Sequence, residues 1–156
     1  MVSQTIYFLR KFRAEFLLVF ILAVSTNTTA NPDFDLAQYR GKVVVVDFWA
    51  SWCVPCRRSF PWLNEMHEKY ADDGLVIVGV NMDASDTDAQ TFLAEFPALF
   101  QIINDPDGDL AREYDVIAMP SSYVIGRDGT QVARHLGFKV KRQEEYEALL
   151  LETLTK

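Results

Sequence analysis

A run of apolar residues that leads directly into two closely spaced cysteines is the strongest constraint on how this chain can fold. Residues 43–61 read VVVVDFWASWCVPCRRSFP. The first part, Val43–Trp49, is apolar except for Asp47, which is typical of a strand buried on both faces. Apolar residues then recur at helical spacing from Cys53 to about Tyr70. The segment therefore predicts a buried strand followed by a helix that begins at Cys53.

The spacing of the two cysteines predicts that they act as a redox pair. The thiolate, and not the thiol, is the nucleophile in disulfide exchange. Unpaired N–H groups and the dipole at the start of a helix stabilise negative charge. We therefore expect Cys53 to be the reactive thiol, with Arg57 and Arg58 adding positive potential. Cys56 follows one turn later, where it can attack a mixed disulfide formed on Cys53.

Composition supports one globular domain whose cysteines are free for chemistry. The chain has 156 residues, of which 49% are hydrophobic, and this suits a single packed core. Cys53 and Cys56 are its only cysteines, so a network of disulfides cannot hold the fold together. The formal net charge is −7, and it is −9 without the first thirty residues, which carry a net charge of +2. An acidic body without a basic stripe argues against nucleic acid as a partner.

The N-terminal sequence predicts a secretory signal peptide over residues 1–30, followed by one domain over residues 31–156. Phe16–Val24 is continuously apolar, small polar residues follow it, and cleavage is expected before Asn31. Three basic residues precede the apolar run: Arg10, Lys11 and Arg13. The alternative is an uncleaved membrane anchor, but nine apolar residues fall short of the roughly 18 that a spanning helix needs. Export would place the cysteines in an oxidising compartment, such as the periplasm.

The rest of the chain alternates between strand and helix patterns. Strands are expected over residues 75–80, 100–103, 122–125 and 131–136, and helices over residues 87–96, 109–114 and 141–154. Thr87 and Gln90 have the spacing of a capping box, and the acidic residues 83–88 are expected to form a solvated turn. Asp128-Gly129 predicts a hairpin turn between the last two strands. This order of elements predicts an α/β fold with a mixed sheet.

Several motifs around and beyond the cysteine pair occur together in one known family. They are Asp47-Phe48-Trp49-Ala50, Trp52-Cys53-Val54-Pro55-Cys56, Pro61, Tyr39-Arg40-Gly41-Lys42, residues 87–103, Asp105-Pro106-Asp107-Gly108, Met119-Pro120 and Arg134-His135-Leu136-Gly137-Phe138. With these motifs the chain resembles the thioredoxin superfamily, and more narrowly the exported TlpA/ResA-type thiol-disulfide oxidoreductases. The resemblance runs from about Phe34 to the C-terminus. It implies an α/β thioredoxin fold, in which a central mixed β-sheet is flanked by helices, with an extra helix-strand insertion.

The resemblance also implies roles for individual residues. Cys53 corresponds to the attacking cysteine, and Cys56 to the buried resolving cysteine. Pro120 corresponds to a cis-proline that lies against the disulfide and lines a groove for the client peptide. Asp47 corresponds to a buried acid that passes a proton to or from the resolving cysteine. Burial without a cationic partner would raise the pKa of Asp47, which suits a proton carrier.

Residues beside this set are expected to contact the client: Trp52, Val54, Pro55 and Met119. The chain also departs from the family pattern in two places. Ser59 stands where many ResA-type proteins have a glutamate, so their pH behaviour does not carry over to this chain. The segment before Val43 is shorter than the family's N-terminal hairpin, which leaves less sheet edge for partners.

The motifs together favour an extracytoplasmic thiol-disulfide oxidoreductase that reduces protein disulfides without a bound cofactor or metal. Its partners would be thiol- or disulfide-bearing proteins, such as cytochrome c apoproteins, and a membrane thiol donor upstream, and it would act as a monomer. Oxidation or isomerisation by the same pair is one alternative. A thiol- or metal-binding protein is another, although structural zinc takes four ligands and only His67 and His135 could join the cysteines.

Overall fold

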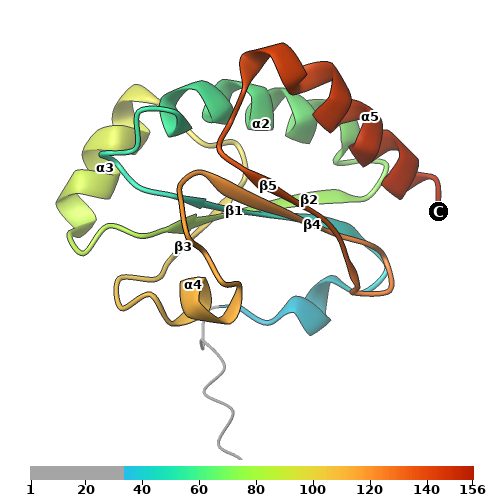
Figure 1. Cartoon of the computed structure of the whole chain (residues 1–156), viewed down its shortest axis with the longest axis horizontal. Helices are drawn as coiled ribbons and strands as arrows, with labels where there is room; N and C mark the ends of the chain where they lie inside the picture. The colour runs from blue at the N-terminus through green and yellow to red at the C-terminus, as the bar shows by residue number, and fades with distance from the viewer. Residues whose placement is uncertain (1–33) are drawn as a thin grey trace, which may run out of the picture.

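A five-stranded mixed sheet forms the centre of the computed structural model, which describes residues 34–156 (Figure 1). The strands are β1 (Val43–Trp49), β2 (Leu75–Asn81), β3 (Gln101–Asn104), β4 (Ser121–Ile125) and β5 (Gln131–Leu136). They lie in the order β3-β2-β1-β4-β5; β1, β2 and β3 are parallel, β4 is antiparallel to β1, and β5 is antiparallel to β4. The predicted mixed sheet is thus confirmed, whereas the predicted signal peptide lies outside the described residues.

Helices cover both faces of this sheet. They are η1 (Leu36–Tyr39, a 3-10 helix), α2 (Cys56–Tyr70), α3 (Asp86–Glu95), α4 (Asp109–Glu113), η2 (Val140–Arg142, a 3-10 helix) and α5 (Gln143–Leu154). α2, α3 and α5 lie over one face, and α4 and η1 lie over the other (Figure 1). α3 and β3 together form the predicted helix-strand insertion. Within residues 34–156, every helix is too short or too polar to cross a membrane.

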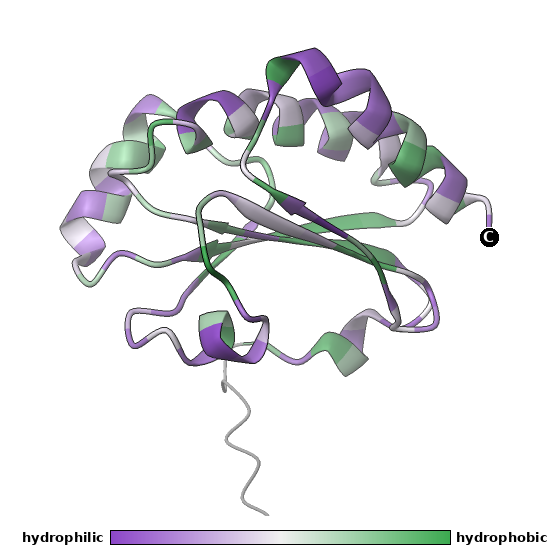
Figure 2. Ribbon diagram, in the orientation of Figure 1, coloured by the Kyte–Doolittle hydropathy of each residue, from purple (hydrophilic) through white to green (hydrophobic). Residues whose placement is uncertain are grey.

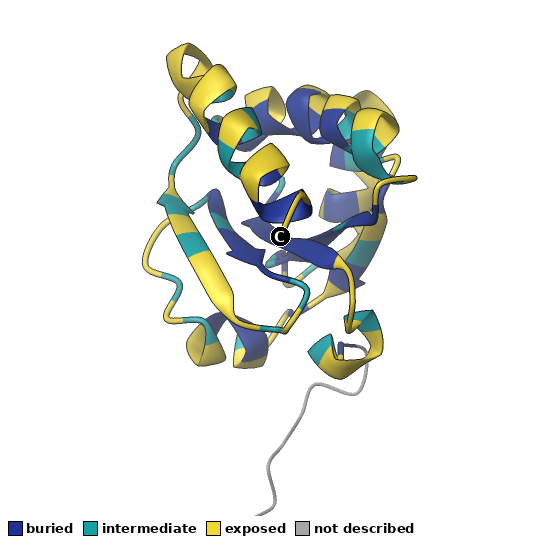
Figure 3. Cartoon of the chain, turned by 90° about the vertical axis from the view of Figure 1, so that its right-hand side faces the viewer, coloured by how far each residue is buried: buried dark blue, intermediate teal, exposed yellow. Residues whose placement is uncertain are grey.

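Side chains of β1 alternate between two apolar layers, one on each side of the sheet. Val45 and Trp49 belong to the layer beneath α2 and α5, whereas Val44 and Phe48 belong to the layer on the opposite face. Apolar residues accordingly concentrate in the strands and on the inward sides of the helices (Figure 2). The outward helix surfaces and much of β5 are exposed (Figure 3). All seven residues of β1 are buried, as predicted for a strand covered on both faces.

An aromatic cluster fixes α2 and α3 over the end of β1. The ring centroid of Trp49 lies 5.0 Å from that of Phe60 on α2 and 4.8 Å from that of Phe92 on α3. Phe60 also lies 5.5 Å from Phe100, which immediately precedes β3. Each such pair contributes about 0.5–1.5 kcal/mol beyond the burial of its surface. The cluster therefore holds the start of α2 against the strand end where the cysteines lie.

The predicted start of α2 is wrong by three residues. The helix begins at Cys56, and Cys53 lies in the turn before it. Pro55 has helical dihedral angles, φ −65° and ψ −25°, and has no N–H group to leave unpaired, so it suits the beginning of a helix. α2 then continues through Pro61 to its predicted end. The last helix likewise begins slightly later than predicted, at Gln143, after the turn of η2.

The predicted capping box at the start of α3 is also wrong. The N-cap residue is Ser85, which has extended backbone angles, and no side chain caps the helix there. Thr87 and Gln90 instead lie within the helix. Asp86 and Asp88 occupy its first turn, where their negative charges interact favourably with the helix dipole. This charge distribution stabilises the helix start without a capping box.

Gly79, on β2, occupies a place that no side chain can fill without displacing its neighbours. A Cβ atom there would lie 2.7 Å from Ile102 Cδ1, 3.1 Å from Phe100 Cε2 and 3.2 Å from Trp49 Nε1. We expect Gly79→Ala to lower the free energy of unfolding by about 1–3 kcal/mol through overpacking, as measured by urea unfolding. Adding Ile102→Val removes the nearest atom, so the double variant should recover part of the loss. An unchanged urea midpoint in Gly79→Ala would contradict this crowding.

Candidate active site

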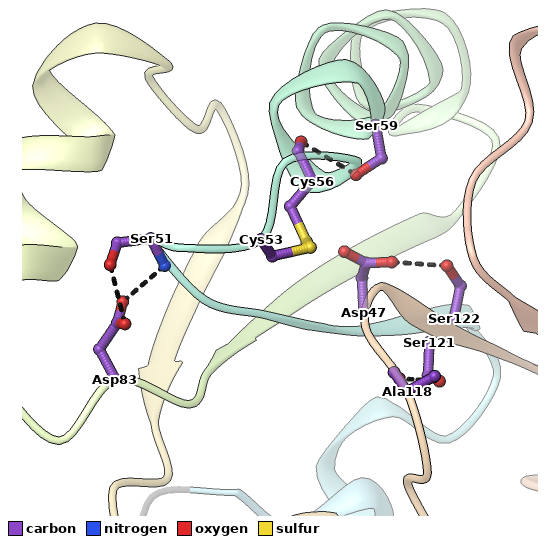
Figure 4. Close-up of a disulfide and its surroundings, with 9 residues drawn as sticks. All are labelled: Asp47, Ser51, Cys53, Cys56, Ser59, Asp83, Ala118, Ser121 and Ser122. Atoms are coloured by element: carbon purple, nitrogen blue, oxygen red, sulfur yellow. Dashed lines mark hydrogen bonds between the residues drawn. A yellow bond between two sulfur atoms is a disulfide. The ribbon is translucent and has the colours of Figure 1, made fainter.

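The two cysteines form a disulfide between the end of β1 and the first turn of α2 (Figure 4). Their Cα atoms are 5.3 Å apart. Two backbone hydrogen bonds hold the turn: Cys53 N donates to Ala50 O, and Cys56 N donates to Cys53 O, each at 3.0 Å. Cys53 is 3% exposed, whereas Cys56 is completely buried. Cys53 is therefore the sulfur that an incoming group can reach.

The residues predicted to contact a client lie in the segment around Cys53 and in the loop before β4. Trp52 and Val54, on either side of the first cysteine, are 67% and 65% exposed, and Pro55 is half-buried. Met119 is half-buried and packs against the apolar layer that includes both cysteines. Ile117, two residues earlier in the same loop, is 76% exposed and was not predicted. Exposed or half-buried apolar side chains thus occur both in the segment that carries Cys53 and in the loop before β4.

The loop before β4 has the conformation that the resemblance implies. The peptide bond between Met119 and Pro120 is cis, which confirms that expectation, and Pro120 is buried. Ser121 Oγ donates a hydrogen bond of 2.6 Å to Ala118 O, which ties the two ends of this loop together (Figure 4).

Arg57, predicted to add positive potential at the cysteines, lies in the first turn of α2 and has an exposed side chain that contacts the end of α3. Its guanidinium lies 3.9 Å from Glu95 Oε2 and 5.5 Å from the ring centroid of Phe96, both at the end of α3. Both partners of the ion pair are exposed, so it contributes at most about 1 kcal/mol. Arg57 therefore links α2 to α3, and its effect on the reactivity of Cys53 stays a prediction.

Asp47 lies in β1, and its completely buried side chain faces the disulfide layer (Figure 4). Ser122 Oγ, on β4, donates a hydrogen bond to Asp47 Oδ1. The second carboxyl oxygen, Oδ2, is buried without a hydrogen-bond partner among the described residues. In Figure 4 this free oxygen points toward the side of the carboxyl on which the disulfide lies. Asp47 is thus held by Ser122 through Oδ1, and its Oδ2 is unpaired among the described residues.

The surroundings of Asp47 raise its pKa from 3.8 to about 7. The main cause is burial, because loss of water destabilises the carboxylate, and the hydrogen bond from Ser122 partly opposes it. None of the salt bridges among residues 34–156 involves Asp47. The predicted direction of the shift is therefore confirmed. A carboxyl group with a pKa near 7 can both accept and release a proton at neutral pH.

Asp47 differs in its hydrogen bonding from the other buried polar residues of the described chain. Ser59, where the resemblance leads one to expect a glutamate, is buried and donates a hydrogen bond of 3.1 Å to Cys56 O. Two other carboxylates are buried among the described residues, but both accept hydrogen bonds from backbone N–H groups: Asp83 and Asp105. Asp47 differs from them because one of its oxygens is unpaired.

Asp83 was expected in a solvated turn but is only 5% exposed. Its carboxylate accepts hydrogen bonds from Ser51 N at 2.8 Å and Ser51 Oγ at 2.9 Å (Figure 4). Its own N–H donates to Asn81 Oδ1 at 3.0 Å. These bonds fix the segment between β1 and the disulfide. The sequence signal that could have shown this burial is the position of Asp83 just after β2. Parallel neighbouring strands such as β1 and β2 end at the same edge of a sheet, so Asp83 lies beside the segment that follows β1.

The two histidines lie on separate elements, His67 on α2 and His135 on β5. Within residues 34–156, no group of three or more His, Cys, Asp or Glu side chains is arranged to hold a metal ion. His135 instead packs on Tyr146, with the ring centroids 4.6 Å apart.

Comparison with known sequences places the chain among thioredoxin-like proteins. A model of the AhpC/TSA family matches residues 19–134. The thiol-disulfide oxidoreductase ResA of Bacillus thuringiensis subsp. konkukian is 33% identical over 113 residues. That match covers 72% of this chain and 65% of the relative, so the chain spans about two thirds of the relative's length.

Solved structures are similar in fold and, in part, in sequence. A candidate thiol:disulfide interchange protein DsbE from Chlorobium tepidum is 46% identical, with a TM-score of 0.74, and the match covers 76% of this chain and 84% of that one. A secreted disulfide oxidoreductase of Mycobacterium tuberculosis, homologous to E. coli DsbE, is 25% identical with a TM-score of 0.66. That match covers 76% of this chain and 87% of the other.

The raised pKa of Asp47 predicts how its replacement changes stability with pH. The folded pKa of about 7 exceeds the ordinary value of 3.8, so the folded protein binds more protons between these values and becomes less stable as pH rises through them. We expect Asp47→Asn to raise the free energy of unfolding by roughly 2–4 kcal/mol at about pH 8 and to change it little near pH 4. Urea unfolding of the oxidised protein measures both values. An equal gain at the two pH values would contradict a buried, titrating carboxyl group.

Proposed function

The chain belongs to the AhpC/TSA family of the thioredoxin superfamily, with relatives of the ResA type, and from this we propose that it is a thiol-disulfide oxidoreductase that reduces protein disulfides outside the cytoplasm. The observation that carries the proposal is the pairing of a reachable Cys53 with a buried Cys56 and a buried carboxyl, Asp47, which has one free oxygen. This arrangement supplies an attacking thiol, a resolving thiol and a proton acceptor.

The reaction begins with the reduced pair. The Cys53 thiolate attacks a disulfide of the client, forms a mixed disulfide and releases one client sulfur as a thiolate. Asp47 then accepts the proton of Cys56, whose thiolate attacks Cys53 Sγ. The Cys53–Cys56 disulfide forms, and the second client sulfur leaves as a thiolate. The client is thereby reduced by two electrons, and the protein is oxidised by two.

The surface around Cys53 supports a protein client. Trp52, Val54, Pro55 and Met119 would pack on an extended segment of the client, and Pro120 would lie beside the disulfide at the base of that surface. These side chains are apolar and belong to two loops, so they suit a peptide more than a small charged substrate. The reaction needs no bound cofactor.

Location and partners follow from the proposed direction of the reaction. Residues 1–30 would direct the chain out of the cytoplasm, and residues 31–156 would act there as a monomer. A membrane thiol donor would reduce the Cys53–Cys56 disulfide after each turnover. The clients would be thiol- or disulfide-bearing proteins, with cytochrome c apoproteins among them. The similarity to a secreted disulfide oxidoreductase of Mycobacterium tuberculosis supports the location.

The reduction potential of the cysteine pair distinguishes a reductase from an oxidase or isomerase. We expect equilibration with glutathione buffers to give a value below about −220 mV, because a reductase requires an oxidised form that is relatively stable. A value near about −120 mV would mean that the protein introduces disulfides, and the proposed direction would be wrong.

Cysteine replacements test the order of the steps. Cys53→Ser should abolish the reduction of insulin disulfides by dithiothreitol above the uncatalysed rate, because no attacking thiol is left. Cys56→Ser should retain the attack but not the resolution, so mixed disulfides with the client should accumulate on non-reducing gels. Normal insulin reduction by the Cys53→Ser protein would overturn the proposed mechanism.

A further inference from the structure

A row of three polar side chains crosses the sheet from the centre toward its edge. Asp47 on β1 is paired in register with Ser122 on β4, and Ser122 is paired with His135 on β5. Directly paired residues on antiparallel strands have neighbouring side chains on one face of the sheet, with Cβ atoms about 4.5–5.5 Å apart. Asp47 is completely buried, whereas Ser122 and His135 are half-buried. Exposure to solvent thus increases along the row, away from the disulfide.

A small cavity lies along the outer part of this row. Its volume is about 20 Å³, and Ser122 and His135 line it together with Trp62, Phe138 and Tyr146. A water molecule needs at least about 10–15 Å³ of such space and two or more polar partners. The Ser122 hydroxyl and the imidazole of His135 supply polar groups in a cavity otherwise walled by apolar and aromatic side chains. The cavity is therefore large and polar enough for one water molecule.

The present inference rests on the proposed function, in which Asp47 takes one proton from Cys56 in each turnover. That proton can return to Cys56 when the disulfide is reduced again, or it can leave for bulk water by a separate route. Asp47 and Cys56 are both completely buried. The sulfur of Cys53 is bonded to the client while the mixed disulfide exists, and the client covers it. Ser122 is the remaining polar contact of Asp47, and it leads away from the disulfide.

We propose that Ser122 relays protons between Asp47 and this cavity, with His135 on the outer side of the path. In the outward direction the carboxyl group rotates so that the proton taken up on Oδ2 faces Ser122, and Asp47 donates this proton to Ser122 Oγ while the serine hydroxyl turns outward. Ser122 passes its own hydroxyl proton to a water molecule in the cavity or to the imidazole of His135, which releases a proton to bulk water. One proton enters and one leaves each group, and no electrons move. Ser122 is thus a positioning and relay residue that acts through Asp47.

The charges around the path are compatible with this direction. On the inner side, Asp47 faces the cysteines of α2 and the hydroxyl of Ser122. On the outer side, His135 faces Arg142 of η2 and Glu145 and Tyr146 of α5. Burial is the main cause that lowers the pKa of His135, Arg142 lowers it further, and Glu145 opposes both. The lowered pKa favours the neutral imidazole, so a proton that reaches His135 from Ser122 is passed on to bulk water.

Three serine variants test the relay. Ser122→Ala removes the hydroxyl, Ser122→Thr restores one at the same place, and Ser121→Ala is the matched control. Ser121 is the adjacent buried serine, and its hydroxyl bonds to Ala118 O (Figure 4). The first measurement is the pKa of Asp47 by NMR in the resting, oxidised protein. The second is the rate at which Cys56 resolves a preformed mixed disulfide with a peptide, across pH.

The relay predicts a distinct result for each serine variant. Ser122→Ala should raise the pKa of Asp47, because a bond that stabilises the carboxylate is lost. The rise of the resolution rate with pH should then move to higher pH, and the rate near pH 7 should fall about tenfold. Ser122→Thr should restore the pKa of Asp47 and bring the resolution rate to within about twofold of the original, and Ser121→Ala should leave the pKa of Asp47 in place. Unchanged values in Ser122→Ala, or equal losses in all three variants, would overturn the relay.

His135 is tested by the concentration of buffer. His135→Phe keeps an aromatic ring against Tyr146 but removes the nitrogen atoms. Turnover of this variant should be slower than that of the original protein in dilute buffer and should recover as buffer is added, because buffer molecules replace the missing acceptor. Equal turnover in dilute buffer would exclude His135 from the path. The NMR measurement needs no client, so it tests the Ser122–Asp47 contact even if the protein reduced no disulfide and the proposed function failed.

Discussion

Burial of a carboxyl group without a cation is the constraint on which the functional part of this structure depends. An isolated carboxylate loses several kcal/mol of solvation when it leaves water. Among residues 34–156, Asp47 receives a single hydrogen bond in return, from Ser122. Its neutral and ionised forms are consequently close in free energy at neutral pH. A nearby lysine or arginine would have left this group ionised and unable to hold a proton.

The alternation of side chains along β1, which builds the two apolar layers, also determines where Asp47 lies. Asp47 lies between Val45 and Trp49 on one face of β1, so its side chain enters the layer beneath α2. The aromatic rings around Trp49 hold α2 above that layer. Asp83 holds the connecting segment through Ser51. The position of the disulfide above the carboxyl is therefore determined by packing on one side and by hydrogen bonds on the other.

Much of this arrangement could be predicted from sequence because it depends on local pattern. Val43–Trp49 is continuously apolar, and the structure gives the predicted strand with the predicted bounds. The start of α2 was misplaced, since Pro55 can begin a helix where apolar spacing alone suggests an earlier start. Asp83 was assigned to a solvated turn, because its burial depends on the neighbouring strand end. Ser122 was not recognised as the partner of Asp47, because the two lie 75 residues apart and meet only through the antiparallel register.

The orientation of the free oxygen of Asp47 toward the disulfide side also links electron transfer to acid–base equilibria. Once the disulfide is reduced, a Cys56 thiolate and an Asp47 carboxylate would be like charges within one dry layer, and such groups do not both ionise readily. They then titrate as a pair and share a proton over part of the pH range. The number of protons taken up with each pair of electrons would accordingly change around neutrality. The reduction potential of the Cys53–Cys56 pair would thus vary with the pH of its compartment.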